Sequence, residues 1–199
     1  GHNALKLNTA ANNTAVGYGA LSSDTQGSKN VALGRSALAT QNFSSATDSY
    51  NTAVGYQAGT SVTTGQSNTL MGGLAGDAIT TGDHNIAIGK DALHANTQAN
   101  KSVAIGSSAL YSQNITSDSD AYNVAVGFNS GYAVSTGTRN TFLGPLAGDA
   151  VTTVNSNTAI GYDAGGANQT GTRTTFVGDS AGSNSTVSAV SYTHPDAAD

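Results

Sequence analysis

The side chains in this sequence that could bind or react are sparse, and the most suggestive ones come in two matched pairs. Asp48 and Tyr50 close the stretch FSSATDSYN (43–51), and Asp120 and Tyr122 close ITSDSDAYN (115–123). An exposed tyrosine offers a flat face on which a sugar or a protein can stack. The four residues are therefore candidate receptor contacts. The alternative is that both tyrosines fold back and cover a neighbouring part of the fold.

Catalytic chemistry is not predicted by the remaining acidic residues. Asp77 and Asp149 stand in AGDA connectors that resemble turns, where Asx turns and loop caps explain them. Asp118 and Asp120 have the residue types of a glycosidase pair, but no feature of the sequence would raise a pKa or build a cleft around them. We therefore predict no catalytic residue and expect that the protein is not an enzyme.

Metal and cofactor sites are not expected either. The histidines lack H-x-H or H-x-x-x-H spacing, so surface positions are favoured, although in a trimer one histidine per chain could meet an ion on the axis. The glycine-rich GGLAG (72–76) lacks the lysine and the helix of a phosphate-binding loop. The four histidines are His2, His84, His94 and His194.

The composition argues against several classes of protein. Glutamate is absent and methionine occurs once, so residues that favour helices are scarce. A net charge of −5 gives no basic footprint for nucleic acid, and the absence of cysteine excludes a disulfide framework. No apolar run reaches transmembrane length, and GHNALKLN is not a signal peptide. Gly1 and the final HPDAAD read as cut points in a longer protein.

The element that must position the candidate residues is an internal repeat. A five-residue phrase resembling N-T-A-V-G begins at residues 13, 30, 51, 68, 85, 102, 123, 140, 157 and 174. The step is always 17, except from 30 to 51 and from 102 to 123, where it is 21. The starts at 30, 51, 68 and 85 recur at 102, 123, 140 and 157, which indicates duplication of a four-repeat block. The fifth position of every phrase, the glycine column, consists of Gly17, Gly34, Gly55, Gly72, Gly89, Gly106, Gly127, Gly144, Gly161 and Gly178.

The phrase predicts a short β-strand, with its second and fourth residues on one face and its third residue on the other. Connectors such as SVTTG predict a second strand, followed by a turn that needs the conformational freedom of glycine. One repeat is then one coil, built as strand, turn, strand, turn. Stacked coils form an all-β parallel roll, a β-solenoid ~45–50 Å long for ten coils.

The domain organisation follows from the repeat. We expect a lead-in segment over 1–12, a ten-coil β-roll over 13–182, and an exit segment or linker over 183–199. The two longer steps each insert four residues. Because an insertion within a strand would shift the side chains of every later coil, both insertions must leave the stack as loops.

The thinness of such a coil predicts self-association. Ordering the backbone and side chains of one coil costs roughly 25 kcal/mol, whereas two or three inward aliphatic side chains recover only a few kcal/mol each. The glycine column and a nearly all-alanine eighth column suggest a surface where another backbone comes close. The alternative is that small residues merely fit tight corners. We predict a homotrimer.

The phrases also carry a resemblance to known proteins. SVAIGSSAL (102–110) is similar to the head repeat of trimeric autotransporter adhesins, and the resemblance covers residues 13–182. It implies a left-handed, trimeric parallel β-roll whose core aliphatics occupy the second and fourth columns. Here, however, the coil is longer and carries insertions. NTAVGYQAG and NTFLG arrays followed by YTHP (192–195) look more like bacteriophage tail-fibre proteins.

This resemblance implies a structural and adhesive role, in which a tail fibre of a virion holds or presents surfaces that bind a host receptor. The expected partners are two further copies of the chain, other fibre or baseplate proteins, and a host surface glycan or protein. A bacterial cell-surface adhesin head and a carbohydrate-binding module with tyrosine-bearing loops are the alternatives. Ice binding is disfavoured, because the fourth column is aliphatic throughout.

Overall fold

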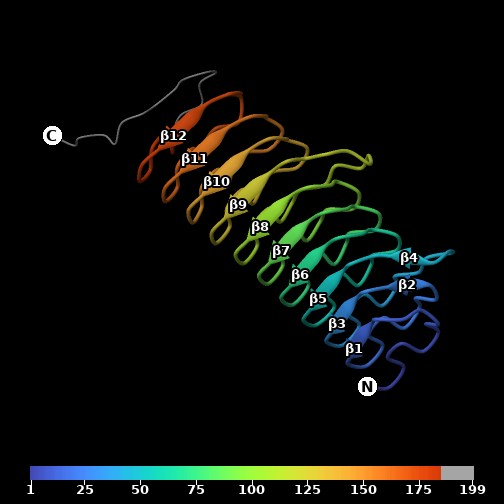
Figure 1. The fold of residues 1–199 in the computed structure, drawn as a ribbon. Helices are drawn as coiled ribbons and strands as arrows, with labels where there is room; N and C mark the ends of the chain where they lie inside the picture. Colours follow the sequence, from blue (N-terminus) through green and yellow to red (C-terminus); the bar gives the residue numbers. More distant parts are fainter. Residues whose placement is uncertain (185–199) are drawn as a thin grey trace.

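The chain forms one stack of parallel coils in a computed structural model that describes residues 1–184 (Figure 1). Each phrase supplies one strand, and ten of these strands form a single parallel sheet in the order of the sequence. The ten are β1 (Thr14–Val16), β3 (Val31–Leu33), β5 (Thr52–Val54), β6 (Thr69–Met71), β7 (Ile86–Ile88), β8 (Val103–Ile105), β9 (Val124–Val126), β10 (Thr141–Leu143), β11 (Thr158–Ile160) and β12 (Thr175–Val177). The predicted all-β solenoid of about ten coils is confirmed.

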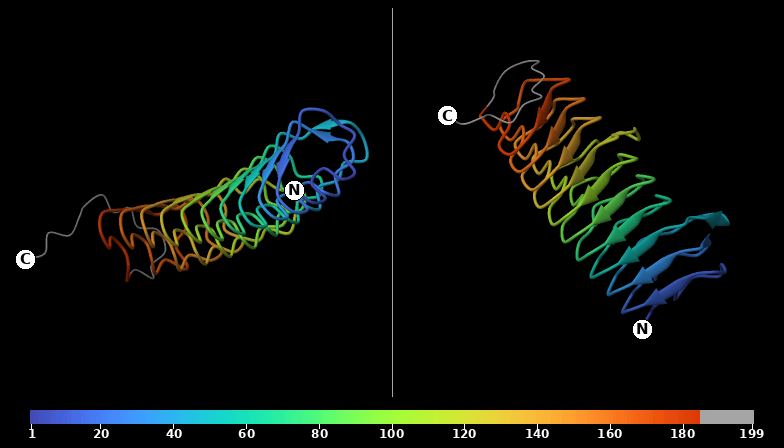
Figure 2. Two further views of the ribbon diagram at one scale, coloured as in Figure 1. Left: turned by 90° about the horizontal axis from the view of Figure 1, so that it is seen from below. Right: turned by 60° about the vertical axis from the view of Figure 1, so that its left-hand side comes forward.

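The strands stack in register along one side of the roll. Equivalent positions pair throughout, so that Thr52 lies between Val31 and Thr69. Figure 2 shows from two further directions that the strands follow one line, while the turns of each coil form the opposite side. No segment of residues 1–184 is a helix that could cross a membrane.

The insertions leave the stack without disturbing this register. Val31 pairs with Thr52 across the first insertion, and Val103 pairs with Val124 across the second, just as equivalent residues do elsewhere. Both loops project on the same side of the roll (Figure 1). The prediction that they must bulge outward is confirmed.

The glycine column is required by the backbone of the chain itself. All ten glycines have φ between +130° and +142°, a region that L-residues rarely adopt. A Cβ placed on Gly106 would lie 2.4 Å from the carbonyl oxygen of Gly127 in the next coil. The eighth-column alanines are buried within the same chain, Ala37 and Ala109 among them. The alanines therefore lie inside the roll and do not line an approach to another chain, and the glycines are required by the backbone of the single chain whether or not another chain approaches them.

The two faces of the strand alternate as predicted, but the interior is not where the resemblance places it. Third-column residues such as Ala53 and Ala104 are fully buried, while the second and fourth residues of the same strands point outward. The implied core of second- and fourth-column aliphatics is therefore wrong for the single chain. The roll is so narrow that its interior accepts mostly alanine beside the strand.

Large and small core residues compensate for one another across the roll. Where the third column is Leu70 or Phe142, glycines replace leucine at the ninth position of the same coil and of the preceding coil. A Cβ on Gly148 would lie 2.4 Å from the Phe142 ring, and one on Gly59 would lie 2.5 Å from Leu70 Cδ1. Each large side chain thus fills space that two coils leave empty.

A ladder of buried asparagines joins the coils behind the sheet. Asn68 Oδ1 accepts the backbone N–H of Asn85 at 2.9 Å, and Asn68 Nδ2 donates to the carbonyl of Gly82 at 2.9 Å. The first position of most phrases repeats this arrangement, for example in Asn51 and Asn140. Each asparagine therefore ties its own connector to the next coil and satisfies backbone groups that the roll buries.

The predicted second strand is wrong for most coils. In residues 1–184 such pairing occurs between β2 (Gly27–Ser28) and β4 (Thr47–Asp48), with one further bridge between Asn100 and Asp120. Elsewhere the connectors of successive coils are joined by isolated backbone hydrogen bonds, such as the one from the Thr63 N–H to the Thr80 carbonyl. The connector glycines also lack positive φ. At positions such as Gly65 a glycine is required because the backbone of the next coil lies too close for a side chain. A Cβ on Gly65 would lie 2.6 Å from the carbonyl oxygen of Gly82.

The lead-in segment belongs to the roll. Leu5 N–H donates to the Ala20 carbonyl and Thr9 N–H donates to the Thr25 carbonyl, so residues 1–12 stack on the first full coil. The sequence signal was GHNAL (1–5), which resembles GYGAL at 17–21. The exit segment lies outside the described residues from 185 onward.

Candidate receptor-contact site

Both pairs of candidate contacts stand at the foot of an insertion loop, where the chain returns to the stack. Thr47 N–H donates to the Gln26 carbonyl and Ser49 N–H donates to the Ser28 carbonyl, which fixes Asp48 beside the preceding coil. The second foot is fixed in the same way, through Ala121 N–H and the Asn100 carbonyl. The extra strand pairing thus occurs where the candidate side chains need support.

The first foot forms a three-residue cluster with a lysine of the preceding coil. Lys29 Nζ lies 2.7 Å from Asp48 Oδ2 and donates to Tyr50 Oη at 2.9 Å. The ammonium is 4.9 Å from the centre of the tyrosine ring, so it sits nearer the hydroxyl than the ring centre. Ser28 Oγ donates to the second carboxylate oxygen of Asp48 at 2.7 Å. The Asp48 carboxylate is therefore held from two directions.

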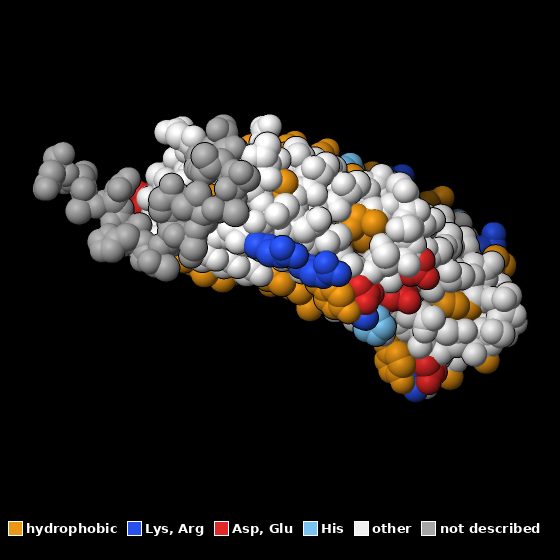
Figure 3. Space-filling view, turned by 90° about the horizontal axis from the view of Figure 1, so that it is seen from above, with side chains coloured by type: hydrophobic (Ala, Val, Ile, Leu, Met, Phe, Trp, Pro, Cys, Tyr) orange, Lys and Arg blue, Asp and Glu red, His pale blue; other side chains and the backbone are white. Residues whose placement is uncertain are grey.

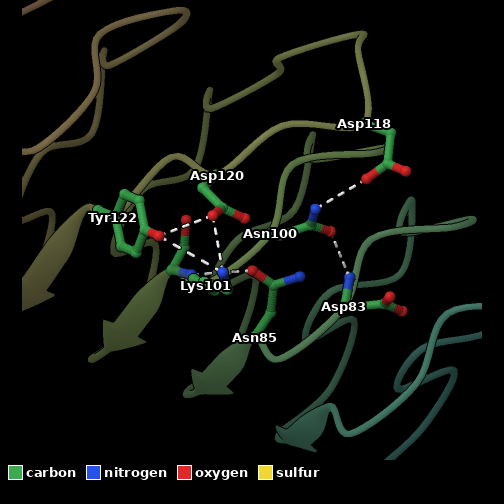
Figure 4. Close-up of polar contacts among 8 residues, drawn as sticks. Asp83, Asn85, Asn100, Lys101, Asp118, Asp120 and Tyr122 are labelled. Carbon is green, nitrogen blue, oxygen red and sulfur yellow. Dashed lines mark hydrogen bonds and ion pairs between the residues drawn. The ribbon is translucent and has the colours of Figure 1, made fainter.

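The second foot repeats this cluster at the equivalent place in the second copy of the block (Figure 4). Lys101 Nζ lies 2.7 Å from Asp120 Oδ2 and 3.4 Å from Tyr122 Oη, and the tyrosine hydroxyl donates to the same carboxylate oxygen at 2.7 Å. Asn100 Nδ2 donates to Asp118 at 2.8 Å on the adjoining part of the loop. We call these two groups the Lys–Asp–Tyr clusters.

The clusters favour the charged forms of their members. The ion pair with Lys101 and then the Tyr122 hydroxyl lower the pKa of Asp120, and Lys29 followed by Ser28 lowers that of Asp48. The carboxylates in turn raise the pKa values of Lys29 and Lys101. The ion pairs should therefore persist from about pH 4 to beyond about pH 10. Because the groups are exposed, salt screens them strongly.

The tyrosines remain accessible while they are held. Tyr50 is 53% exposed and Tyr122 is 48% exposed, so neither folds back to cover the roll. Each cluster presents a positioned aromatic ring beside a cation and an anion, a combination suited to stacking and polar contact with a ligand. Lys29 and Lys101 were missed by the sequence reasoning. Their signal was that they occupy equivalent positions of the two blocks, directly before a phrase.

The histidines take separate places. His94 Nδ1 lies 2.7 Å from Asp77 Oδ1, and its ring stacks on Tyr111, which stacks on Tyr132. His2 stacks on Tyr18 and His84 is exposed, whereas His194 lies outside the described residues. Within residues 1–184 no three His, Asp or Glu side chains gather in a way that could hold a metal ion.

The aspartates considered for chemistry differ in their surroundings. Asp118 is bound by Asn100 and Asp120 by Lys101, so the two carboxylates have different partners. Burial raises the pKa of Asp149, and the nearby Asp163 adds to the shift. Burial also raises the pKa of Asp77, against the opposing effect of His94.

In comparisons with known proteins, no family model, curated protein or solved structure matches the chain.

Proposed function

We propose that this chain is a structural and adhesive segment of a trimeric fibre, most simply a bacteriophage tail fibre. In this proposal the roll is a spacer that holds three copies of each insertion loop away from the fibre axis. The setting would be a virion outside the cell. The partners would be two further copies of the chain, other fibre proteins and a receptor on the host surface.

The observation that carries this proposal is the outer face of the ten-stranded sheet. Its fourth column is aliphatic in every coil, and five of its members are at least 36% exposed. These five are Val16, Met71, Leu143, Ile160 and Val177. Parallel sheets are normally covered on both faces, and large exposed apolar patches mark interaction surfaces. We infer that the second and fourth columns pack against the same columns of other copies.

Self-association also resolves the energetic difficulty of a thin roll. Inside the chain the sheet is backed largely by alanine, which contributes little burial per coil. A second apolar layer between chains would supply the missing burial, and a homo-oligomer with closed symmetry is the simplest way to form it. Three rolls around one axis would leave the insertion loops outside, available for multivalent attachment.

Light scattering coupled to size-exclusion chromatography tests the assembly. We expect a mass three times the 19.7 kDa of one chain. Val126→Asp puts a charge into the fourth column and should dissociate the trimer or lower its melting temperature by many degrees. Thr64→Asp, on an exposed connector, is the matched control and should change neither. A stable wild-type monomer at micromolar concentration would refute the assembly, and a dimer would refute the threefold axis.

The attachment role is tested by trimming the loops. Removal of 45–48 and 117–120 takes away β4 and the ion pairs of both clusters together with the loop tips, so the melting temperature should fall by only about a few degrees, because loop length costs little and exposed ion pairs are weak. A glycan array then compares the trimmed and intact chains. Binding lost on trimming supports receptor contact by the loops, whereas binding by an intact monomer would support a carbohydrate-binding module instead. A chain that binds no glycan is better described as a shaft.

A further inference from the structure

We propose that one edge of the roll is a binding track for a linear anionic polysaccharide. This inference rests on the proposed attachment function and names the chemical class of the receptor. The track consists of the residue that directly precedes each phrase, which we call the ridge: Asn12, Lys29, Tyr50, Ser67, His84, Lys101, Tyr122, Arg139, Ser156 and Arg173.

The backbone places all ten ridge residues in one line. Each has φ between 51° and 66°, so the chain makes the same left-handed corner in every coil. The N–H groups of His84, Lys101, Arg139 and Arg173 donate to equivalent carbonyls of the preceding coil. In-register stacking then sets successive ridge positions ~4.8 Å apart along the roll. The line borders the sheet but is separate from the second and fourth columns of the proposed trimer contact.

Most of the basic residues of the chain lie on this line. The sequence has seven Lys and Arg residues, and four of them occupy the ridge, together with one histidine and two tyrosines. All seven of these basic and aromatic side chains are exposed. In a protein of net charge −5 such sorting is not expected from composition alone, and it creates a local positive and aromatic strip on an acidic molecule.

The lysines and the arginines of the ridge differ in whether they are paired with carboxylates. Lys29 and Lys101 are neutralised by the carboxylates of the Lys–Asp–Tyr clusters. Arg139 and Arg173 form no salt bridge within residues 1–184, and Ser156 stands between them on the ridge. Figure 3 shows two blue side chains side by side on a largely white surface nearer the C-terminal end, with red groups beside them. No other Lys or Arg follows Lys101 in the sequence.

These features select a polysaccharide with carboxylate or sulfate groups. The guanidinium groups of Arg139 and Arg173 are two coils apart and can each form paired hydrogen bonds with an anionic group. Tyr122 stands one coil before Arg139 and offers a ring on which a pyranose can stack. A regular polymer lying along the roll could engage the arginines and the tyrosine together. Asp118 and Asp120 lie near the tyrosine and would repel an anionic group placed on it, so the charged groups of the polymer must meet the arginines while an uncharged ring face meets Tyr122. Nucleic acid is disfavoured by the net charge of −5.

Binding to defined polymers tests the track. The intact chain is immobilised and exposed to polygalacturonate, dextran sulfate, neutral dextran and oligothymidylate in low salt. We expect binding to at least one anionic polysaccharide, no binding to dextran, and weakening as salt increases. The variant Arg139→Gln/Arg173→Gln should bind roughly tenfold more weakly, since it loses two charge-assisted contacts.

A matched control separates the ridge from overall charge. Lys6→Gln/Lys90→Gln also removes two exposed cations, so both double variants change the net charge from −5 to −7. The control should lose less than about twofold in affinity. Equal losses in the two double variants, absence of polysaccharide binding, or tighter binding of oligothymidylate would each overturn the track. The mass and melting temperature of each variant report on the fibre proposal separately, so either idea can fail alone.

Discussion

The two copies of the four-coil block, residues 30–101 and 102–173, show which features of the roll are fixed and which can vary. Sheet register and the glycine column are the same in both, and each insert foot pairs with the preceding coil, through a two-residue strand pair at the first foot and a single bridge at the second. The filling of the interior differs. Leu70 and Ile79 in the first copy correspond to Phe142 and Val151 in the second. The larger Phe142 is thus accompanied by the smaller Val151. Backbone geometry is therefore fixed more strictly than the identity of the core residues.

The buried polar groups of the two copies change as pairs. In the first copy Asn30 Nδ2 donates to Ser49 Oγ at 2.7 Å, and Ser49 Oγ donates back to Asn30 Oδ1 at 2.9 Å. In the second copy the equivalent residues are Ser102 and Ala121, and Gln113 Nε2 donates to Ser102 Oγ at 2.9 Å. Both members of the pair have lost their partner together. Covariation within one chain thus records a contact that the fold would otherwise leave unsatisfied.

The largest effect is expected where the copies are identical. Gly34→Val and Gly106→Val should each cost roughly 3–5 kcal/mol of unfolding free energy, because a strongly positive φ strains a β-branched residue and its Cβ meets a backbone oxygen. Urea denaturation measures the loss. Gly73→Ala is the control, since a Cβ there has no neighbour within 4 Å. A cost below about 1 kcal/mol at either column position would show that the backbone can relax.

The next effect separates the two interiors. Phe142→Ala should cost about 4 kcal/mol and Leu70→Ala about 3 kcal/mol, because each leaves a cavity beside ninth-column glycines, which have no side chain to fill it. Thermal or urea unfolding checks the order.

A volume-conserving exchange provides the control for that cavity. Phe142→Leu combined with Val151→Ile reproduces the pair found in the first copy and should cost less than about 1.5 kcal/mol. It should also be more stable than Phe142→Leu alone. If the double variant is no better than the single one, the two positions do not share the same space.

The sequence predicted the repeat, the register, the outward loops and the four foot residues, because each depends on spacing along the chain. It failed where the answer depends on three-dimensional distance. The narrow interior reverses the expected core face of the strand: Ala53 is fully buried, whereas the larger Val54 beside it is only partly buried, so hydrophobicity alone does not identify the inner face. Lys29 and Lys101 complete the clusters only because stacking brings successive coils together. The 72-residue spacing links the two lysines to each other, but no local pattern around either one predicts its contact with the next coil.

A smaller effect concerns the exchanged polar pair. Ser102→Asn alone should be destabilising, because the larger side chain competes with Gln113 for the same space and lacks a serine partner. Adding Ala121→Ser should recover about 1 kcal/mol, the usual value of one buried hydrogen bond. A double-mutant cycle by urea unfolding measures this coupling. Strict additivity of the two changes would mean that the pair in the first copy is not an energetic unit.

The smallest effect differs in size between the two copies. Burial raises the pKa of Asp149, and Asp163 raises it further, so the carboxylate is ionised at neutral pH at some cost to the fold. A group whose folded-state pKa is raised favours folding most below its unfolded pKa, near about 4, and loses that contribution as pH rises. Asp149→Asn should therefore stabilise the chain at pH 7 by about a few tenths of a kcal/mol, since solvent screens much of the effect, and give no gain at pH 3.

Asp77 is the counterpart of Asp149 in the first copy. It faces His94 Nδ1 at 2.7 Å, whereas the second copy has Gly166 at the position equivalent to His94. Asp77→Asn also removes that partner, so it should stabilise the chain at pH 7 less than Asp149→Asn does. Melting temperatures of both variants at the two pH values check the contrast, and equal gains in both copies would show that His94 does not compensate for the burial of Asp77.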